Sequence, residues 1–291
     1  MVRAAGRDFV SGHLPVMVAE VIAFLRTAGP GVIVDGTAGG GGHLRAMMEA
    51  FPEARFIAVD RDPDALDRLP APSDRLIVRA SSYSALDGIV EESGFGAADA
   101  ALFDLGLSSI QLDDPARGFS HRLNGPLDMR FSRREDVPDA AELLNSLPEK
   151  ELADVIFKFG EEGRSRILAG SIVAARPLET TGDLVSAVGR AIRGNPARAL
   201  SKLFQALRIA VNDELGELSR LLAGMHRWIR PGGVAAFLTF HSLEDRMVKR
   251  FFIDSGVFEH ADPPWEVPSR EEARSNPRAR SARLRRGVRL S

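Results

Sequence analysis

The sequence predicts an α/β fold built on a parallel sheet. Short apolar runs alternate with segments of helical apolar spacing; the runs cover residues 32–35, 55–60, 75–78 and 100–104. Strands this short are typical of a sheet covered on both faces, with right-handed crossovers between the strands. We therefore expect a doubly wound, Rossmann-like sheet, whose ligands bind at the carboxyl ends of the strands.

The pattern changes between about residues 112 and 205, where no convincing strand is found. Helical spacing recurs there, with turn signals such as Asn124-Gly125-Pro126 and Gly194-Asn195-Pro196 between the segments; the expected helices are 140–144, 149–159, 164–175 and 181–192. We expect a helical insertion over 112–205, which recognises the substrate. It interrupts a discontinuous domain of residues 1–111 and 206–291.

The α/β pattern then resumes with one long amphipathic helix over 203–229, ended by Arg230-Pro231-Gly232-Gly233. A strand over 234–240 and a helix over 243–252 follow. The stretch 261–280 is rich in Pro, Arg and Ser and is expected to be a loop. Residues 283–290 are expected to form a final edge strand.

Composition narrows the classes of protein. With 44% apolar and 27% charged residues, the 291-residue chain has the composition of an ordinary globular protein. No cysteine is present, which excludes disulfides, thiolate metal sites and cysteine nucleophiles and fits a reducing cytoplasm. No apolar run reaches the roughly 20 residues that span a bilayer, and we see no signal peptide. The expected location is the cytoplasm.

The net charge of −2 hides an asymmetry, because residues 270–291 carry eight arginines and only two acids. A basic segment is compatible with a phosphate-rich partner. From charge alone, a solvated chain end is slightly the better interpretation.

A glycine-rich loop, Asp35-Gly36-Thr37-Ala38-Gly39-Gly40-Gly41-Gly42-His43, joins the first strand to the next helix. Glycine lets the backbone approach a ligand, and the helix that follows points free N–H groups at it. Asp60 ends the second strand, where a carboxylate accepts hydrogen bonds from the ribose of an adenosine cofactor. The pattern fits a dinucleotide or S-adenosylmethionine. Asp35 favours the latter, because it would repel a pyrophosphate.

Three further side chains are ambiguous from the sequence alone. Tyr83 follows the third strand, where its ring could stack on adenine or simply pack in the core. His43 could cap the helix or face the ligand, and no second ligand stands at metal-binding spacing near it. Asp104 ends the fourth strand and would either face the methyl donor or cap the next turn.

At the fourth strand the chain becomes recognisable from motifs spread in order along its length. They are His13-Leu14-Pro15-Val16-Met17, Asp35-Gly36-Thr37, Asp60-Arg61-Asp62-Pro63, Asp104-Leu105-Gly106-Leu107-Ser108-Ser109, Gln111-Leu112-Asp113, Arg117-Gly118-Phe119-Ser120, Gly125-Pro126-Leu127-Asp128-Met129-Arg130, Phe204-Gln205-Ala206-Leu207-Arg208-Ile209, Phe240-His241-Ser242-Leu243-Glu244-Asp245-Arg246 and Asn276-Pro277-Arg278-Ala279-Arg280-Ser281. The chain closely resembles the bacterial 16S rRNA cytosine-N4-methyltransferases of the RsmH (MraW) type.

This resemblance implies an S-adenosylmethionine-dependent domain interrupted by a helical domain, acting on a cytosine in the decoding region of the small ribosomal subunit. The cofactor contacts that it implies are Gly41, Gly42, His43, Asp60, Tyr83, Asp104 and Gln111. The sequence departs from the family at Ser201-Lys202, where the family has Thr-Arg, and at Ile110, where it has Pro. Lysine lacks the bidentate fork of arginine, so a phosphate contact at Lys202 is in doubt.

The chemistry follows from the nucleophile. The exocyclic N4 of cytosine is a poor nucleophile, because its lone pair is delocalised into the ring. A protein group that accepts the N4 proton would therefore favour methyl transfer. Asp104 is the expected acceptor, and His241, after the fifth strand, is the second candidate beside a purely structural role. Phe119 and Phe131 are the candidates for a ring that stacks on the base.

Two other classes of function stay open on the sequence. The glycine loop alone fits a nicotinamide-dependent oxidoreductase, which would retain NAD. A non-catalytic RNA-binding or assembly factor would bind ribosomal subunits without transferring a methyl group. The sequence predicts no oligomeric state.

Overall fold

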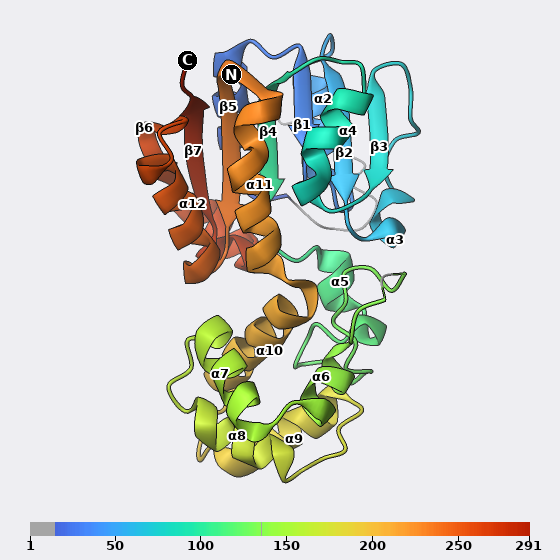
Figure 1. Ribbon diagram of the computed structural model, residues 1–291, viewed down its shortest axis with the longest axis vertical. Helices are drawn as coiled ribbons and strands as arrows, with labels where there is room; N and C mark the ends of the chain where they lie inside the picture. Colours follow the sequence, from blue (N-terminus) through green and yellow to red (C-terminus); the bar gives the residue numbers. More distant parts are fainter. Residues whose placement is uncertain (1–14, 135) are drawn as a thin grey trace. The chain divides into compact units, whose positions relative to one another are not determined.

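The computed structural model describes residues 15–134 and 136–291, so His13 and Leu14 of the first motif lie outside the described residues. The chain forms two compact units (Figure 1). The sheet unit comprises the chain up to Gly106 together with Leu218–Ser291, and the insertion unit comprises Leu107–Glu217. We expected the insertion to run over 112–205; the structure divides the chain a few residues earlier and about a dozen residues later.

The sheet unit holds a seven-stranded sheet of order β3-β2-β1-β4-β5-β7-β6. Its strands are β1 (Val32–Asp35), β2 (Arg55–Asp60), β3 (Leu76–Ala80), β4 (Ala98–Asp104), β5 (Ile229–Thr239), β6 (Phe258–Glu266) and β7 (Arg283–Arg289). The first five strands in this order are parallel, and β7 runs antiparallel to both β5 and β6. The order reverses beside β1, so the Rossmann-like, doubly wound prediction is confirmed.

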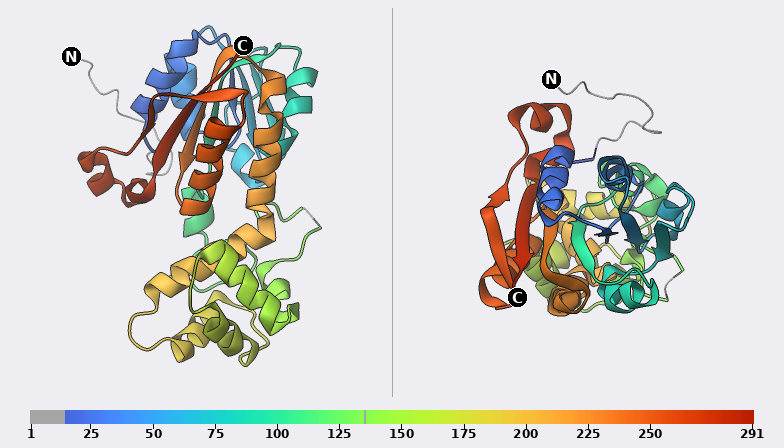
Figure 2. Two further views of the ribbon diagram at one scale, coloured as in Figure 1. Left: turned by 60° about the vertical axis from the view of Figure 1, so that its left-hand side comes forward. Right: turned by 90° about the horizontal axis from the view of Figure 1, so that it is seen from above.

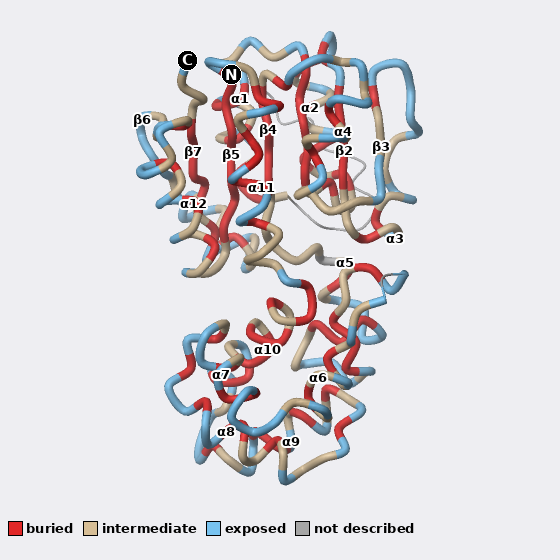
Figure 3. Tube along the Cα trace, in the orientation of Figure 1, coloured by how far each residue is buried: buried red, intermediate tan, exposed pale blue. Residues whose placement is uncertain are grey.

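Helices cover both faces of this sheet (Figure 2). One layer consists of α1 (Val18–Leu25) and α2 (Gly42–Ala50); the other consists of α4 (Leu86–Glu92), α11 (Glu214–Trp228) and α12 (Ser242–Asp254). Successive side chains of a strand point to opposite faces, so Ile33 packs in the first layer while Val32 and Val34 pack in the second. The central strands are buried along their length, as Figure 3 shows.

Two expectations for the chain end were wrong. β7 is not an edge strand but lies between β5 and β6. The stretch 261–280, expected to be a loop, contains the end of β6 and the helix α13 (Arg270–Ser275). Strand β6 contains Pro263 and Pro264 and is mostly exposed, which an edge strand tolerates because its outer N–H groups need no partner. Its sequence therefore lacks the apolar signature of a buried strand.

The single helix expected over 203–229 is two helices, α10 (Ala197–Asn212) and α11. Asp213 separates them with a φ of 49°, a left-handed conformation that ends α10. Helix α11 ends at Trp228, one residue before the expected end, but Arg230-Pro231-Gly232-Gly233 lies inside β5, at a register shift against β4. Ala98 pairs with Ile229 and Ala100 pairs with Val234, so β5 has three more residues than β4 between these two pairs.

The insertion unit is helical, as expected. Its helices are α5 (Ser109–Asp113), α6 (Ala140–Ser146), α7 (Glu149–Gly160), α8 (Ser165–Val173), α9 (Thr181–Ala191) and α10, with the first residues of α11. Leu203, Phe204, Leu207 and Val211 of α10 are buried in the core of this unit. That burial explains why the unit extends beyond residue 205.

Candidate functional site

Asp35 ends β1 and is 1% exposed. Its Oδ1 accepts the N–H of Thr37 over 3.2 Å, whereas Oδ2 has no hydrogen-bond partner among the described residues. Burial raises the pKa of this carboxyl to about 7; His43 opposes the rise, and the charges of Asp104 and Asp60 add to it. A buried carboxylate oxygen without a partner at the start of a glycine loop is suited to a cationic ligand.

The glycine loop turns sharply between β1 and α2. Gly39 and Gly41 have φ of 48° and 81°, where a side chain would be strained. A Cβ on Gly36 would lie 2.3 Å from the ring of Phe103, so this glycine also allows β1 and β4 to approach closely. Helix α2 begins at Gly42, immediately after the turn.

Asp60, at the end of β2, holds this loop in place. Its Oδ2 accepts the N–H of Gly39 over 2.7 Å, and its Oδ1 accepts the N–H of Asp62 over 2.8 Å. The sequence-based expectation gave this carboxylate to ribose alone. In the structure it also orders the loop, and a carboxylate has further lone pairs for ligand hydroxyls.

Tyr83 begins a short 3₁₀ turn after β3 and is half-buried. Its ring meets Phe103 edge-on, with centroids 6.2 Å apart. Like Asp60 and the glycine loop, Tyr83 belongs to the sheet unit. It follows the carboxyl end of β3, the strand next to β2.

Asp104 ends β4 with its side chain 24% exposed. Its backbone N–H donates to Thr37 Oγ1 over 2.6 Å, which ties it to the glycine loop. Its Oδ1 accepts the N–H of Gly106 over 3.2 Å, as the turn-capping interpretation predicts, while Oδ2 lies 3.6 Å from Nε2 of buried His43. One oxygen thus braces the turn, and the other faces the first turn of α2.

His241 follows β5 and is the N-cap residue of α12. Its Nε2 lies 2.9 Å from Oε2 of Glu244, which is 3% exposed, although neither ring nitrogen has a hydrogen bond of good geometry among the described residues. Glu244 Oε1 accepts the N–H groups of Phe240 and His241. Sequence reasoning missed the buried Glu244, although it lies in the motif that contains His241.

Phe240 is a second residue that sequence reasoning missed. Asp104 pairs with Leu238 in the β4–β5 register, so the ends of the two strands are adjacent. A Cβ on Gly106 would lie 2.7 Å from the half-buried ring of Phe240, which shows that the ring packs on this glycine. An aromatic side chain directly after a strand that neighbours Asp104 was the available signal.

A family model and curated relatives both match this chain along nearly its whole length. The model of the MraW methylase family matches residues 10–289. This chain belongs to that family. Ribosomal RNA small subunit methyltransferase H of Methylobacterium sp. (strain 4-46) is 46% identical over 307 residues, covering 95% of this chain and 90% of that protein. The protein of the same name from Hyphomonas neptunium is 40% identical, covering 96% and 89%.

The solved structures that align with this chain include an rRNA methylase from Streptococcus thermophilus, with a TM-score of 0.39 and 11% identity over 94% of each chain. An N-methyltransferase from Bradyrhizobium japonicum aligns with a TM-score of 0.42 and 8% identity, also over 94% of each chain. These scores are low, so the fold class rests on the strand order. Among the described residues, no helix combines the length and apolarity needed to cross a membrane.

Two residues that the resemblance or the chemistry singled out lie in the insertion unit of this MraW methylase. Gln111 is buried, and its Oε1 accepts the N–H of Ser108 in a capping box at the start of α5. Phe119 is 5% exposed and stacks on Phe131 with centroids 5.7 Å apart. As a base-stacking platform Phe119 is a wrong prediction, because its ring is part of the unit's core. Phe131, which packs half-buried against the same core, stays a prediction.

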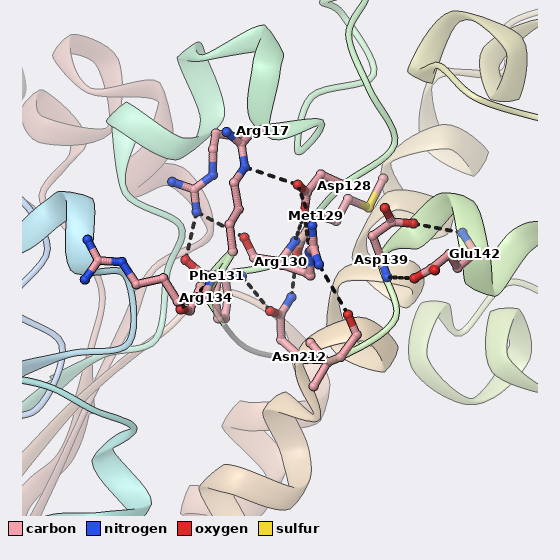
Figure 4. Close-up of polar contacts among 12 residues, drawn as sticks. Arg117, Asp128, Met129, Arg130, Phe131, Arg134, Asp139, Glu142 and Asn212 are labelled. Carbon is pink, nitrogen blue, oxygen red and sulfur yellow. Dashed lines mark hydrogen bonds and ion pairs between the residues drawn. The ribbon is translucent and has the colours of Figure 1, made fainter.

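The motif residues of the insertion unit form a polar network (Figure 4). Asn212, 1% exposed, donates to the carbonyl oxygen of Met129 and accepts the N–H of Phe131, both over 2.7 Å. Arg130 forms a bidentate pair with Asp128. Burial alone would raise the pKa of Asp128, but the bonds from Arg130 outweigh it and lower the pKa. These bonds hold the loop at residues 128–131 in place, and the charges of Asp128 and Arg130 are used within the protein.

Lys202 and the arginines of β7 bind the protein itself. Lys202 Nζ donates to the carbonyl oxygen of Glu161 over 2.6 Å, at the end of α7. Arg283 and Arg285 both pair with Asp245 of α12, at 2.7 Å. Arg286 Nη2 lies 2.8 Å from Glu266 Oε1. These guanidinium groups hold α12 and β6 to β7, which corrects the expectation of a solvated chain end for β7. Arg270, Arg274 and Arg280, which precede β7, are exposed.

Proposed function

We propose that this chain transfers a methyl group from S-adenosylmethionine to the exocyclic N4 of a cytosine in the decoding region of 16S rRNA. It is a methyltransferase by its membership of the MraW methylase family. The observation that carries the finer proposal is Asp104, a partly exposed carboxylate at the end of β4 that is tied to the glycine loop through Thr37. Its position suits an acceptor of the N4 proton.

The residues around the loop fit the donor. Asp35 Oδ2 is a buried oxygen without a hydrogen-bond partner among the described residues, and a cationic amino group would satisfy it. The left-handed turn at Gly41 brings the glycine-loop backbone to the start of α2. Asp60 would bind ribose hydroxyls and Tyr83 would stack on adenine, with Gly42 and His43 contributing the first turn of α2. When bound, S-adenosylmethionine supplies an electrophilic methyl group on sulfur.

Asp104 would accept the proton that N4 loses as its bond to the methyl carbon forms. A carboxylate is a competent acceptor for this proton. The Asp104 side chain is partly exposed, and its Oδ2 is the oxygen that does not bind Gly106. His241, braced by Glu244, is the second candidate for contact with the base. The N–H bond breaks toward oxygen, so no charge accumulates on the methylated amine.

We assign base stacking to Phe240 in place of Phe119. Its ring is half-buried and lies on Gly106, two residues beyond Asp104, in the same unit as the proposed acceptor. Stacking on an aromatic face is the usual way in which proteins hold an unpaired base.

The insertion unit would recognise the RNA, and Gln111 would contribute to the donor site, as the resemblance implies. The proposed partner is the small ribosomal subunit or its 16S rRNA, and the proposed location is the cytoplasm. Both proposals rest on the name that the relatives share, ribosomal RNA small subunit methyltransferase H.

The experiment is transfer of labelled methyl groups to small subunits from a bacterial strain that lacks this modification. After nuclease digestion, we expect label only in N4-methylcytidine. Subunits from the modified parent strain are the matched control and should accept no label. Label in another nucleoside, or none on unmodified subunits with a folded enzyme, would contradict the proposal.

A further inference from the structure

Two stretches of the insertion unit contain basic side chains and no acidic ones. Between Asp183 and Asp213 the chain has five lysines and arginines but no aspartate or glutamate. Between Asp114 and Asp128 it has two arginines and a histidine, again without an acid. In a chain with 40 acidic and 38 basic residues, such stretches concentrate positive charge locally.

The fold brings these two stretches together. His121 lies 3.3 Å from Ser201 Oγ and meets the ring of Phe204 edge-on, which places the loop after Phe119 against α10. Thr181 Oγ1, at the start of α9, donates to the carbonyl oxygen of Leu123 over 2.7 Å. The loop that carries Arg122 is thus bound to both helices of the other stretch.

Four arginines of this region, here called the arginine surface, are exposed: Arg122, Arg190, Arg193 and Arg198. Within the described part of the chain, none of their guanidinium groups forms an ion pair or hydrogen bond. Other basic residues of the unit do: Arg164 pairs with Glu162 and Arg208 pairs with Glu214. The unpaired arginines therefore all lie in the two sequence stretches that contain no acid.

Protein stability does not explain this arrangement. Arg198 lies in the first turn of α10, where the helix dipole favours an acid and disfavours a cation. The Arg122 side chain is exposed, so its packing does not stabilise the fold. Burial lowers the pKa of neighbouring His121, and the positive charge of Arg122 lowers it further. Only Arg190, in the last turn of α9, has a favourable position in its helix. Positive charges without ion-pair partners raise the energy of the free protein when they lie in adjacent stretches, and an anionic partner would offset that energy.

We propose that the arginine surface binds the phosphate backbone of the RNA, independently of its base sequence, while the sheet unit acts on the target cytosine. This inference rests on the proposed function for the identity of the partner. Arginine is suited to phosphate because its planar fork donates two parallel hydrogen bonds. Asn195 Oδ1 accepts the N–H of Ala197 in the turn between Arg193 and Arg198, which presents these two side chains on an ordered turn.

The test is the salt dependence of binding to unmodified small subunits. Each phosphate contact contributes about 0.7–0.9 to the slope of log affinity against log salt concentration, so Arg193→Gln with Arg198→Gln should flatten the slope by about 1.4–1.8. Arg122→Gln should flatten it by about 0.7–0.9. The double lysine variant should keep most of the slope, because it keeps the charge.

Arg166→Gln is the matched control, since Arg166 of α8 is also exposed and lies in the same unit, but next to acids at 161 and 162. It should leave the slope unchanged, and circular dichroism should show that every variant keeps the helices of the insertion unit. An unchanged slope in the double glutamine variant, or an equal loss in Arg166→Gln, would overturn the proposal. Wild-type protein that binds subunits with this slope but transfers no methyl group would instead contradict the proposed function alone.

Discussion

Asp60 Oδ2 accepts the backbone N–H of Gly39 over 2.7 Å, so a side chain at the end of β2 holds the glycine loop that follows β1. The same carboxylate is the proposed ligand of the ribose. Its two roles make it the most informative position for cofactor binding.

Asp60→Ala should weaken S-adenosylmethionine binding by about 1–3 kcal/mol, because ribose hydroxyls lose a charged acceptor. Calorimetry on the purified variant measures this. Asp67→Ala, at an exposed acid directly after α3 (Pro63–Leu66), is the control and should bind normally. Unchanged affinity in folded Asp60→Ala would remove this residue from the site.

Asp35 should make the stability of the free protein depend on pH. Its folded pKa of about 7 exceeds the ordinary value of 3.8, so its stabilising contribution is present at low pH and is lost as pH rises from about 4 to 7. Asp35→Asn removes this titration and should be the more stable protein at pH 8. Both tryptophans, Trp228 and Trp265, lie in the sheet unit, so fluorescence during urea unfolding follows that unit.

The same titration should govern the donor. Below pH 7 the neutral Asp35 would bind the cationic ligand less well, and wild-type affinity should fall by up to about tenfold per pH unit. The affinity of Asp35→Asn should be lower and flatter across this range. Parallel pH curves for the two proteins, in unfolding and in binding, would contradict the role of Asp35.

Phe240 should matter through its aromatic face. Stacking of one base contributes about 1–3 kcal/mol, so Phe240→Leu should lower kcat/KM for the RNA by roughly 5- to 150-fold. Phe240→Tyr keeps the ring and should retain most of the activity. Leucine also fills space on Gly106, so unchanged S-adenosylmethionine affinity would confirm that the loss is not general. Equal activities of the two variants would mean that another group holds the base.

Asp245 should be required for the stability of the sheet unit. Its two ion-pair partners are Arg283 and Arg285, and Arg285, which is 4% exposed, would be left as a buried charge without an ion pair. Asp245→Ala should therefore cost about 3–5 kcal/mol of unfolding free energy, measured by tryptophan fluorescence in urea. Asp254→Ala, at the exposed end of the same helix, should cost little. If Asp245→Ala lost little unfolding free energy, the ion pairs with Asp245 would not explain the arginines of β7, and a role in RNA binding would become the better explanation.

The sequence predicts local features well where burial leaves a pattern. The bounds of β1 and β2 match the expected runs at 32–35 and 55–60, because both strands are continuous apolar segments bounded by turns. The same logic found Asp35, Asp60 and Asp104, since parallel strands bring their carboxyl ends to one edge. Strand β6 escaped because an exposed, proline-containing edge strand has no apolar run.

Features that depend on distant pairing were not predictable. The amphipathic pattern continues through Asp213, so only its left-handed backbone reveals that α10 and α11 are separate. The place of Phe240 beside Gly106 requires the β4–β5 register, and the partners of Arg285 require α12 to pack on β7. Charge composition alone could not distinguish an arginine that binds Asp245 from one that faces solvent.

The central claim is that Asp104 accepts the proton of cytosine N4, and Asp104→Asn tests it most directly. The amide keeps an acceptor oxygen for Gly106 but cannot take up the proton. Single-turnover methyl transfer, at saturating S-adenosylmethionine and saturating unmodified small subunits, should be slower by about 10²–10⁴-fold, while cofactor affinity changes much less. A rate near that of the wild-type protein under these conditions would contradict the claim. It would leave Asp104 as a residue that only positions the donor.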